Sequence, residues 1–461
     1  MPRAVVARLP LLVLALAQLV IALDYNIVYV ALPDIGAGLG FSAHDLQWVV
    51  SAYVVTTGGF LLLGGRTADL LGRRRTFAAA ALVYAGSSLA GGLSDSAGVL
   101  VAARAAQGIG GSLLFPATLA LINTLYAQGP ARNRALAVWG AAGAGGLCFG
   151  SLLGGVLVEA SGWRSVFFVN VPVAAALAWA GWRLFPGDGP RTGPRRYDVT
   201  GALTGTGGIT LLVFSLVRAP EAGWATPSAL LGAALSAALL AAFAVVERRA
   251  REPLVPVRLF AHRGLRAAMA VTALYSATFS SLPYFMTLYF QNVRGYSAFT
   301  TGLAFLVPAV VTALGTKAGE LAVARAGSGR VLGGAMVLGA CGAVVLGLAL
   351  TADGPYSLLL PGIVLVGLGQ GAAWTGMWIA AASGVAAEDQ GVASGMASTT
   401  LQVGGAIGLA LLVALSSGAG PGPPDENQLT GIRVAVFVVA AALCCGAPLT
   451  LALRTSRTPA A

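Results

Sequence analysis

Long apolar runs separated by short polar stretches constrain this fold more than any other feature of the sequence. A run of about 20 apolar residues is long enough to cross a bilayer as a helix. Only 10% of the 461 residues are charged, whereas soluble domains carry about 25% charge. We therefore expect an all-α polytopic membrane protein with fourteen spans. The expected spans are 10–32, 46–65, 76–94, 98–122, 135–158, 164–185, 199–218, 226–246, 265–290, 298–318, 330–350, 356–382, 391–416 and 433–453.

Most of the 28 Lys and Arg residues fall in alternate loops between these runs. Because basic loops stay on the cytoplasmic side, this pattern predicts a multi-pass protein of the cell (inner or plasma) membrane with both termini cytoplasmic. The net charge of +11 is explained by loops that face an anionic leaflet. It therefore predicts a lipid bilayer as partner and no nucleic acid.

A weak internal repeat predicts two bundles. "QGIGGSLLFP" in the fourth run resembles "VGLGQGAAWT" in the twelfth, and "GGRTADLLGRRR" after the second run is echoed by "GELAVARAGSGR" after the tenth. The echo comes eight runs later rather than six, so two extra spans are expected between two six-helix bundles. The predicted domains are 1–186 for the first bundle, 187–260 for the inserted spans with flanking linkers, and 261–461 for the second bundle.

The sequence offers little for an enzyme. His44 and His262 both lie at expected loops, and the four cysteines have neither metal-ligand nor disulfide spacing. No G-x-x-x-x-G-K-[ST] loop is present, so ATP is not the expected energy source. We expect no metal and no cofactor. A membrane enzyme or a sensor is the least favoured class.

The loop "GGRTADLLGRRRTF" (64–77) combines glycines, one aspartate and several arginines. A positive-inside signal would explain its arginines but not its G-x-x-x-D-x-x-G skeleton. This skeleton resembles the loop signature of the major facilitator superfamily. The resemblance implies two bundles that alternate access to a central site, and a conformational latch on the inner side. The candidate latch residues are Gly65, Arg66, Asp69, Gly72, Arg73 and Arg74.

"RAAQGIGG" (104–111) places Arg104 inside the fourth run, with Gln107 one turn later on the same helix face. A guanidinium in a span is costly, so it should face a partner or a water-filled cavity, unless it snorkels to an interface. R-x-x-Q-G-x-G is similar to the superfamily motif associated with proton coupling.

"GLCFGSLLGG" (146–155) is a stripe of small residues suited to intimate helix packing. It is similar to the superfamily's antiporter pattern G-x-x-x-G-P-x-x-G-G, with serine in place of the proline. That departure weakens the prediction of antiport and leaves proton-independent transport open. The matching positions are Gly146, Gly150, Ser151, Gly154 and Gly155.

Asp24 lies in "LDYNIVYVALP" (23–33), in the middle of the first run. This stretch resembles L-D-x-T-x-V-N-V-A-L-P, a motif of the fourteen-span drug:proton antiporter branch. Burial favours the protonated form of a carboxylate, and the resemblance makes Asp24, Arg104 and Gln107 the candidate proton-coupling residues. A static, hydrogen-bonded helix anchor is the alternative.

Aromatic and polar residues of several runs are candidates for a substrate cavity, because ring faces accept varied apolar ligands and cations. Lipid-facing positions are the alternative for each residue. The candidates are Tyr25, Asn26, Tyr53, Phe115, Tyr284, Trp374 and Trp378.

The resemblance predicts proton-coupled efflux of small amphiphilic compounds, such as drugs or antibiotics, by alternating access, powered by the proton gradient. Asp24 is the one acid expected deep in a span, so neutral, zwitterionic or monocationic substrates are favoured over dications. A dedicated exporter of one metabolite, antibiotic or lipid, and a proton-independent facilitator, remain alternatives. We expect the monomer to function alone.

Overall fold

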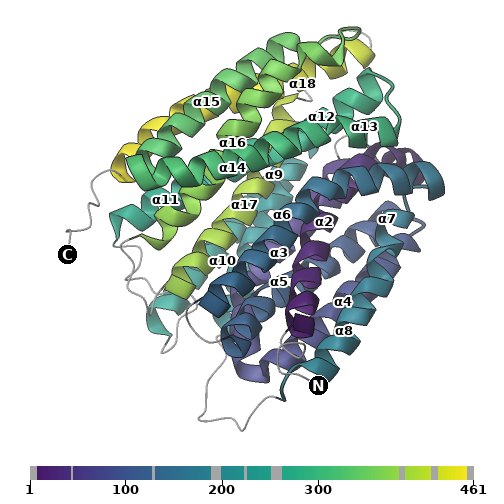
Figure 1. Cartoon of the computed structure of the whole chain (residues 1–461). Helices are drawn as coiled ribbons and strands as arrows, with labels where there is room; N and C mark the ends of the chain where they lie inside the picture. Colours follow the sequence, from purple (N-terminus) through teal and green to yellow (C-terminus); the bar gives the residue numbers. More distant parts are fainter. Residues whose placement is uncertain are drawn as a thin grey trace. The chain divides into compact units, whose positions relative to one another are not determined.

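The computed structural model describes residues 8–42, 45–126, 130–187, 199–222, 226–250, 262–383, 390–416 and 424–453 (Figure 1). These residues form helices joined by short connections, and no strand occurs among them. The chain divides into two compact units. The first comprises residues 1–202 and 297–303, and the second comprises 203–296 and 304–461.

The first unit holds seven α-helices and one 3-10 turn along the described part of its main segment. They are α2 (Arg8–Leu39), η1 (Asp45–Gln47), α3 (Trp48–Leu71), α4 (Arg73–Gly92), α5 (Ala97–Leu125), α6 (Pro130–Ser161), α7 (Ser165–Phe168) and α8 (Asn170–Leu184).

The remaining helices belong wholly or mainly to the second unit, apart from residues 298–303 of α13, which pack with the first. They are α9 (Val199–Ala222), α10 (Pro227–Arg249), α11 (Arg263–Thr278), η3 (Phe279–Ser281), α12 (Leu282–Leu288), η4 (Tyr289–Val293), α13 (Ala298–Ala304), α14 (Leu306–Ala326), α15 (Ser328–Ala349), η5 (Tyr356–Leu358), α16 (Leu360–Ala382), α17 (Gln390–Ser416), α18 (Pro424–Gly446) and η6 (Ala447–Leu453).

Each expected apolar run coincides with a helix or with a broken helix. Among the residues that the structure describes, nine helices are long and apolar enough to cross a membrane. The expected linkers fall mostly outside the described residues, at 188–198 and 251–261.

A proline lies shortly after the break in three of the interrupted spans. Proline lacks the N–H that would bond the carbonyl four residues earlier. Pro172 lies three residues after the break between α7 and α8 at Val169, and Pro308 lies three residues after the break between α13 and α14 at Phe305. Pro283 follows the 3-10 turn η3 in the same way.

The two units repeat the same helix pairings. In the first unit α2 packs on α6, α3 on α5, and α4 on α5 and α8. In the second unit α11 packs on α17, α14 on α16, and α15 on α16 and α18. Matching one-residue turns separate α3 from α4 and α14 from α15, at Gly72 (φ +101°) and Gly327 (φ +80°). Only glycine adopts such values without strain.

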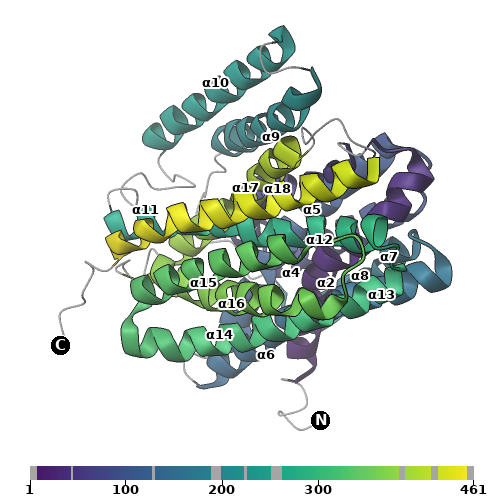
Figure 2. The same ribbon diagram turned by 90° about the horizontal axis from the view of Figure 1, so that it is seen from above.

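Helices α9 and α10 form a hairpin (Figure 2). The Ser236 hydroxyl donates to the carbonyl of Gly208 at 2.8 Å. Gly205 and Gly208 bring the α9 backbone against Phe243 and Leu240 of α10.

Helix α6 holds the backbone of α2 through three glycines spaced one turn apart. A methyl group at each would lie 2.6–2.8 Å from a carbonyl oxygen of α2, which is closer than real contacts allow. The glycine and carbonyl pairs are Gly146 with Leu19, Gly150 with Leu23, and Gly154 with Ile27. Gly155 points to a second neighbour, the carbonyl of Ala298. The stripe therefore fixes α2 on both sides of Asp24.

We expect Gly150→Ala to force α2 away from α6 and to reduce stability by roughly 1–3 kcal/mol, the usual cost of overpacking. Gly140→Ala is the matched control, because it lies on the same helix with no neighbour within 4 Å. Alanine favours a helix over glycine by about 1 kcal/mol, so the control should be as stable as the wild type or more so. Thermal unfolding in detergent measures both, and equal melting temperatures would contradict this packing.

Candidate functional site

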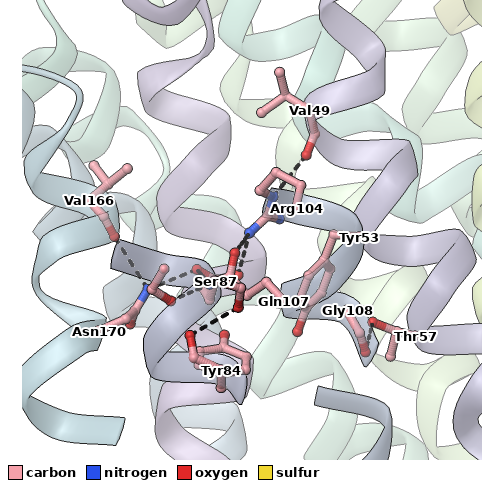
Figure 3. A network of polar contacts seen from close by, with 12 residues as sticks. Val49, Tyr53, Thr57, Tyr84, Ser87, Arg104, Gln107, Gly108, Val166 and Asn170 are labelled. Carbon is pink, nitrogen blue, oxygen red and sulfur yellow. Dashed lines mark hydrogen bonds and ion pairs between the residues drawn. The ribbon is translucent and has the colours of Figure 1, made fainter. Parts of the chain in front are cut away.

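Asp24 lies on α2 with no exposed surface and with hydrogen-bond donors around its carboxylate. Arg104 donates from Nη1 to Oδ2 at 2.7 Å, and Gln107 donates from Nε2 to Oδ1 at 2.9 Å. Asn170 donates from Nδ2 to the same Oδ1 at 2.9 Å. These donors come from two helices, α5 and α8, and Figure 3 shows Arg104 and Asn170 reaching the cluster from different sides.

Arg104 is 2% exposed and therefore does not snorkel to an interface. Besides Asp24, it donates from Nε to the carbonyl of Val49 at 2.9 Å and from Nη1 to Oε1 of Gln107 at 2.6 Å. The carbon at the centre of its guanidinium lies 4.4 Å from the centre of the Tyr53 ring. The buried charge is thus paired with a carboxylate, bonded to a backbone carbonyl and stacked on an aromatic face.

Gln107 is completely buried and links the ion pair to α4. Its Nε2 also donates to the hydroxyl of Ser88 at 3.0 Å, and its Oε1 is occupied by Arg104. The orientation of the amide is therefore set by three partners, Arg104, Asp24 and Ser88, rather than by solvent. Three side-chain donors therefore reach the carboxylate of Asp24, two at Oδ1 and one at Oδ2.

Glycines of the same α5 motif allow α5 to pack closely against α3 beside Arg104 and Gln107. A methyl group at Gly108 would lie 2.5 Å from the carbonyl oxygen of Tyr53, and the Gly108 carbonyl accepts a hydrogen bond from Thr57 at 3.2 Å. At Gly111 a methyl group would approach the Tyr53 hydroxyl to 3.2 Å. The spacing of the motif therefore combines a polar face with close contact to α3.

The candidate latch is described in part. Gly72 makes the turn between α3 and α4 with its positive φ. Arg73 donates to the hydroxyl of Thr124 at the end of α5, and Arg74 lies 4.5 Å from the centre of the Trp182 ring on α8. Gly65, Arg66 and Asp69 lie on α3, and the side chains of Arg66 and Asp69 are outside the described part of the structure. The described arginines thus join the start of α4 to α5 and α8 within the first unit.

Comparison with known proteins identifies the family. The family model of the Major Facilitator Superfamily matches residues 14–409. The chain belongs to the Major Facilitator Superfamily.

Curated relatives within the superfamily are antibiotic resistance and export proteins. The puromycin resistance protein pur8 of Streptomyces alboniger is 38% identical, over 98% of this chain and 92% of the relative. The cephamycin export protein CmcT of Amycolatopsis lactamdurans is 36% identical, over 92% of this chain and 89% of the relative. The family and these relatives are transporters, so the chain is a membrane transporter and not an enzyme.

Solved structures agree on the superfamily fold. An auto-inhibited POT family peptide transporter superposes with a TM-score of 0.73 at 17% identity, covering 97% of both chains. A bacterial homologue of the human lysosomal transporter Spinster, in an inward-facing and unoccupied conformation, gives a TM-score of 0.69 at 16% identity, covering 99% of both chains. At these identities the likeness concerns the fold alone.

In the first unit, the candidate cavity residues form two aromatic pairs. The Tyr25 and Tyr53 rings lie 6.2 Å apart at a steep angle, and Tyr53 is almost completely buried beneath Arg104. The Phe115 ring lies 5.3 Å from that of Trp139, whose Nε1 donates to Thr118 at 3.1 Å. Tyr53 is thus part of the wall around the ion pair. Asn26 is half-buried beside Gly150.

In the second unit, Trp374 and Trp378 form an aromatic group on α16. Their ring centres are 5.7 Å apart, and the Tyr275 ring of α11 lies 5.9 Å from that of Trp374. Both tryptophans are half-buried. Tyr284, in contrast, is 2% exposed and packs edge-on against Phe285 at 5.3 Å.

The sequence interpretation missed Asn170 and Ser88 as members of the Asp24 network. Asn170 stands in "FFVNVP", where a single amide in an apolar run was the available signal. Ser88 gave no signal, because small hydroxyl residues are common in spans and most bond their own helix.

Arg104→Gln should strongly destabilise the protein, because it leaves a buried carboxylate without its counter-ion. Breaking a buried pair in this way costs about 3–5 kcal/mol. Adding Asp24→Asn to Arg104→Gln should recover much of that loss, since no charge then remains buried. Melting temperatures of the two single variants and the double variant complete the cycle. Additive losses would contradict a direct ion pair.

Proposed function

We propose that the chain is a proton-coupled exporter of small amphiphilic compounds that works by alternating access. The observation that carries this proposal is the sealed network in which Asp24 meets Arg104, Gln107 and Asn170. A titratable group without solvent contact is expensive inside a membrane. Conversion of Asp24 between its charged and neutral forms during transport would give this costly group a function.

The proton affinity of Asp24 would change with the distance of Arg104. In the structure the carboxylate is paired with Arg104 at 2.7 Å. When Arg104 and the amides withdraw, burial favours the protonated form. Proton uptake from outside would then accompany or follow substrate release, and proton loss to the cytoplasm would restore the ion pair. The proton gradient supplies the energy.

The proposed architecture is two six-helix bundles, 1–186 and 261–461, with two extra spans within 187–260. The helix pairings shared by the two units support it, as does the α9–α10 hairpin. We propose fourteen spans, cytoplasmic termini in the cell membrane, and a functional monomer. The loop from Gly65 to Arg74 would act as the inner latch between the bundles.

Substrates are proposed to be neutral, zwitterionic or monocationic. In the described structure the carboxylate of Asp24 is bonded to Arg104, so a dication would find no free countercharge there. The Trp374 and Trp378 group and the Phe115 and Trp139 pair offer ring faces for apolar or singly charged ligands.

A dedicated exporter of a single antibiotic is the second candidate. Relatives named for puromycin, cephamycin and tetracenomycin C support it. The breadth of compounds that drive proton movement separates it from a multidrug exporter. A proton-independent facilitator, which Ser151 leaves open, would move no protons with any compound.

Everted membrane vesicles with an acid interior test the proposal. Adding neutral or monocationic amphiphiles, including puromycin, should cause proton efflux detected by a pH-sensitive dye, and dications should cause little. Asp24→Asn should abolish the efflux, since the amide cannot exchange a proton.

Asp95→Asn is the matched control, because Asp95 is exposed in the connection before α5. It should behave as the wild type. A full response in Asp24→Asn would make Asp24 a structural anchor instead. Drug accumulation without proton movement in the wild type would establish proton-independent transport.

A further inference from the structure

Asn170 holds a special position among the partners of Asp24. It is the first residue of α8, directly after the break at Val169, and is 2% exposed. Its Nδ2 donates to Oδ1 of Asp24 at 2.9 Å and lies 3.3 Å from the carbonyl of Val166 (Figure 3). The other donors to Asp24 both belong to α5. Asn170 alone connects the carboxylate to the interrupted α7–α8 segment among the described contacts.

The surroundings of Asp24 show what Asn170 adds. The titratable groups that face the carboxylate are Arg104 from α5, Tyr53 from α3 and Tyr84 from α4. Among the described residues, α6, α7 and α8 contribute no charged side chain to its contacts. Asn170 therefore acts on Asp24 as a neutral dipole, separable from the ion pair.

The Asn170 amide favours the charged form of Asp24. A donor aimed at a carboxylate stabilises the anion over the neutral acid. Oδ1 accepts from both Asn170 and Gln107, so a proton arriving at this oxygen must displace an amide N–H. Gln107 is further held by Arg104 and Ser88, whereas the second contact of the Asn170 amide is the longer one to Val166. The Asn170 amide is thus held by fewer described contacts than the Gln107 amide.

We propose that Asn170 is a positioning residue that stabilises the charged form of Asp24 and sets the pH at which the carrier binds its proton. This inference rests on the proposed proton coupling through Asp24. It assigns to the "FVNVP" segment a role in the pH response rather than in substrate recognition.

Proton release on substrate binding tests this role. Purified protein in weakly buffered detergent is mixed with puromycin or another compound active in vesicles, and a pH dye records the protons released across a pH series. Asn170→Leu replaces the amide with an apolar side chain that has the same branching and the same number of heavy atoms. Losing the donor should move the half-maximal pH of release upward by about one unit, which is a tenfold gain in proton affinity.

Ser94→Ala removes a buried hydroxyl in the same unit that bonds only the Gly91 carbonyl, so its midpoint should stay at the wild-type value. Thermal unfolding verifies that each variant is folded. Asn170→Ala serves if the leucine variant does not fold, and it should shift the midpoint in the same direction.

The outcomes separate the two proposals. A wild-type response that Asp24→Asn abolishes, with an unchanged midpoint in a folded Asn170 variant, overturns the role of Asn170 alone. Absence of proton release in the wild type, with substrate binding shown independently, overturns the proton coupling and this inference with it. A smaller amplitude at an unchanged midpoint would mean that Asn170 is merely structural.

Discussion

The ion pair between Asp24 and Arg104 is the interaction on which the first unit depends. Neither side chain has more than 2% of its surface exposed, and in this environment either charge alone would be costly. The surrounding amides and the Tyr53 ring compensate the pair, and three side-chain donors reach the carboxylate. Charge state and structure are therefore linked at one residue, and a change in one requires a change in the other.

Close helix packing makes this arrangement possible. Glycines of α6 bring its backbone against α2 around Asp24, and Gly108 brings α5 against α3. Such contacts replace the hydrophobic driving force that is absent between helices in lipid. The break before Asn170, three residues ahead of Pro172, places an amide where a continuous helix would follow a different path. Residues that do not contact Asp24 themselves thus help to place its hydrogen-bond donors.

Much of the site could be predicted from the sequence, because charged residues in apolar runs are rare and costly. Asp24, Arg104 and Gln107 were identifiable on that ground, and the structure brings them together. Asn170 was not, since one uncharged amide carries little cost and its role depends on a helix break. The position of Tyr53 over Arg104 also depends on tertiary packing, which periodicity does not encode. The helix locations agreed with the apolar runs. The breaks within the helices could not be predicted from hydropathy, because some prolines lie near a break and others lie inside a continuous helix.

Infrared difference spectroscopy of the purified transporter tests the central claim, that Asp24 exchanges a proton, most directly. Substrate is added at a pH where the free carrier is protonated. The account predicts loss of a protonated-carboxyl C=O band and gain of carboxylate bands, both absent in Asp24→Asn and both retained in Asp95→Asn. A wild-type spectrum without the carboxyl band, under conditions in which substrate binds, would contradict it.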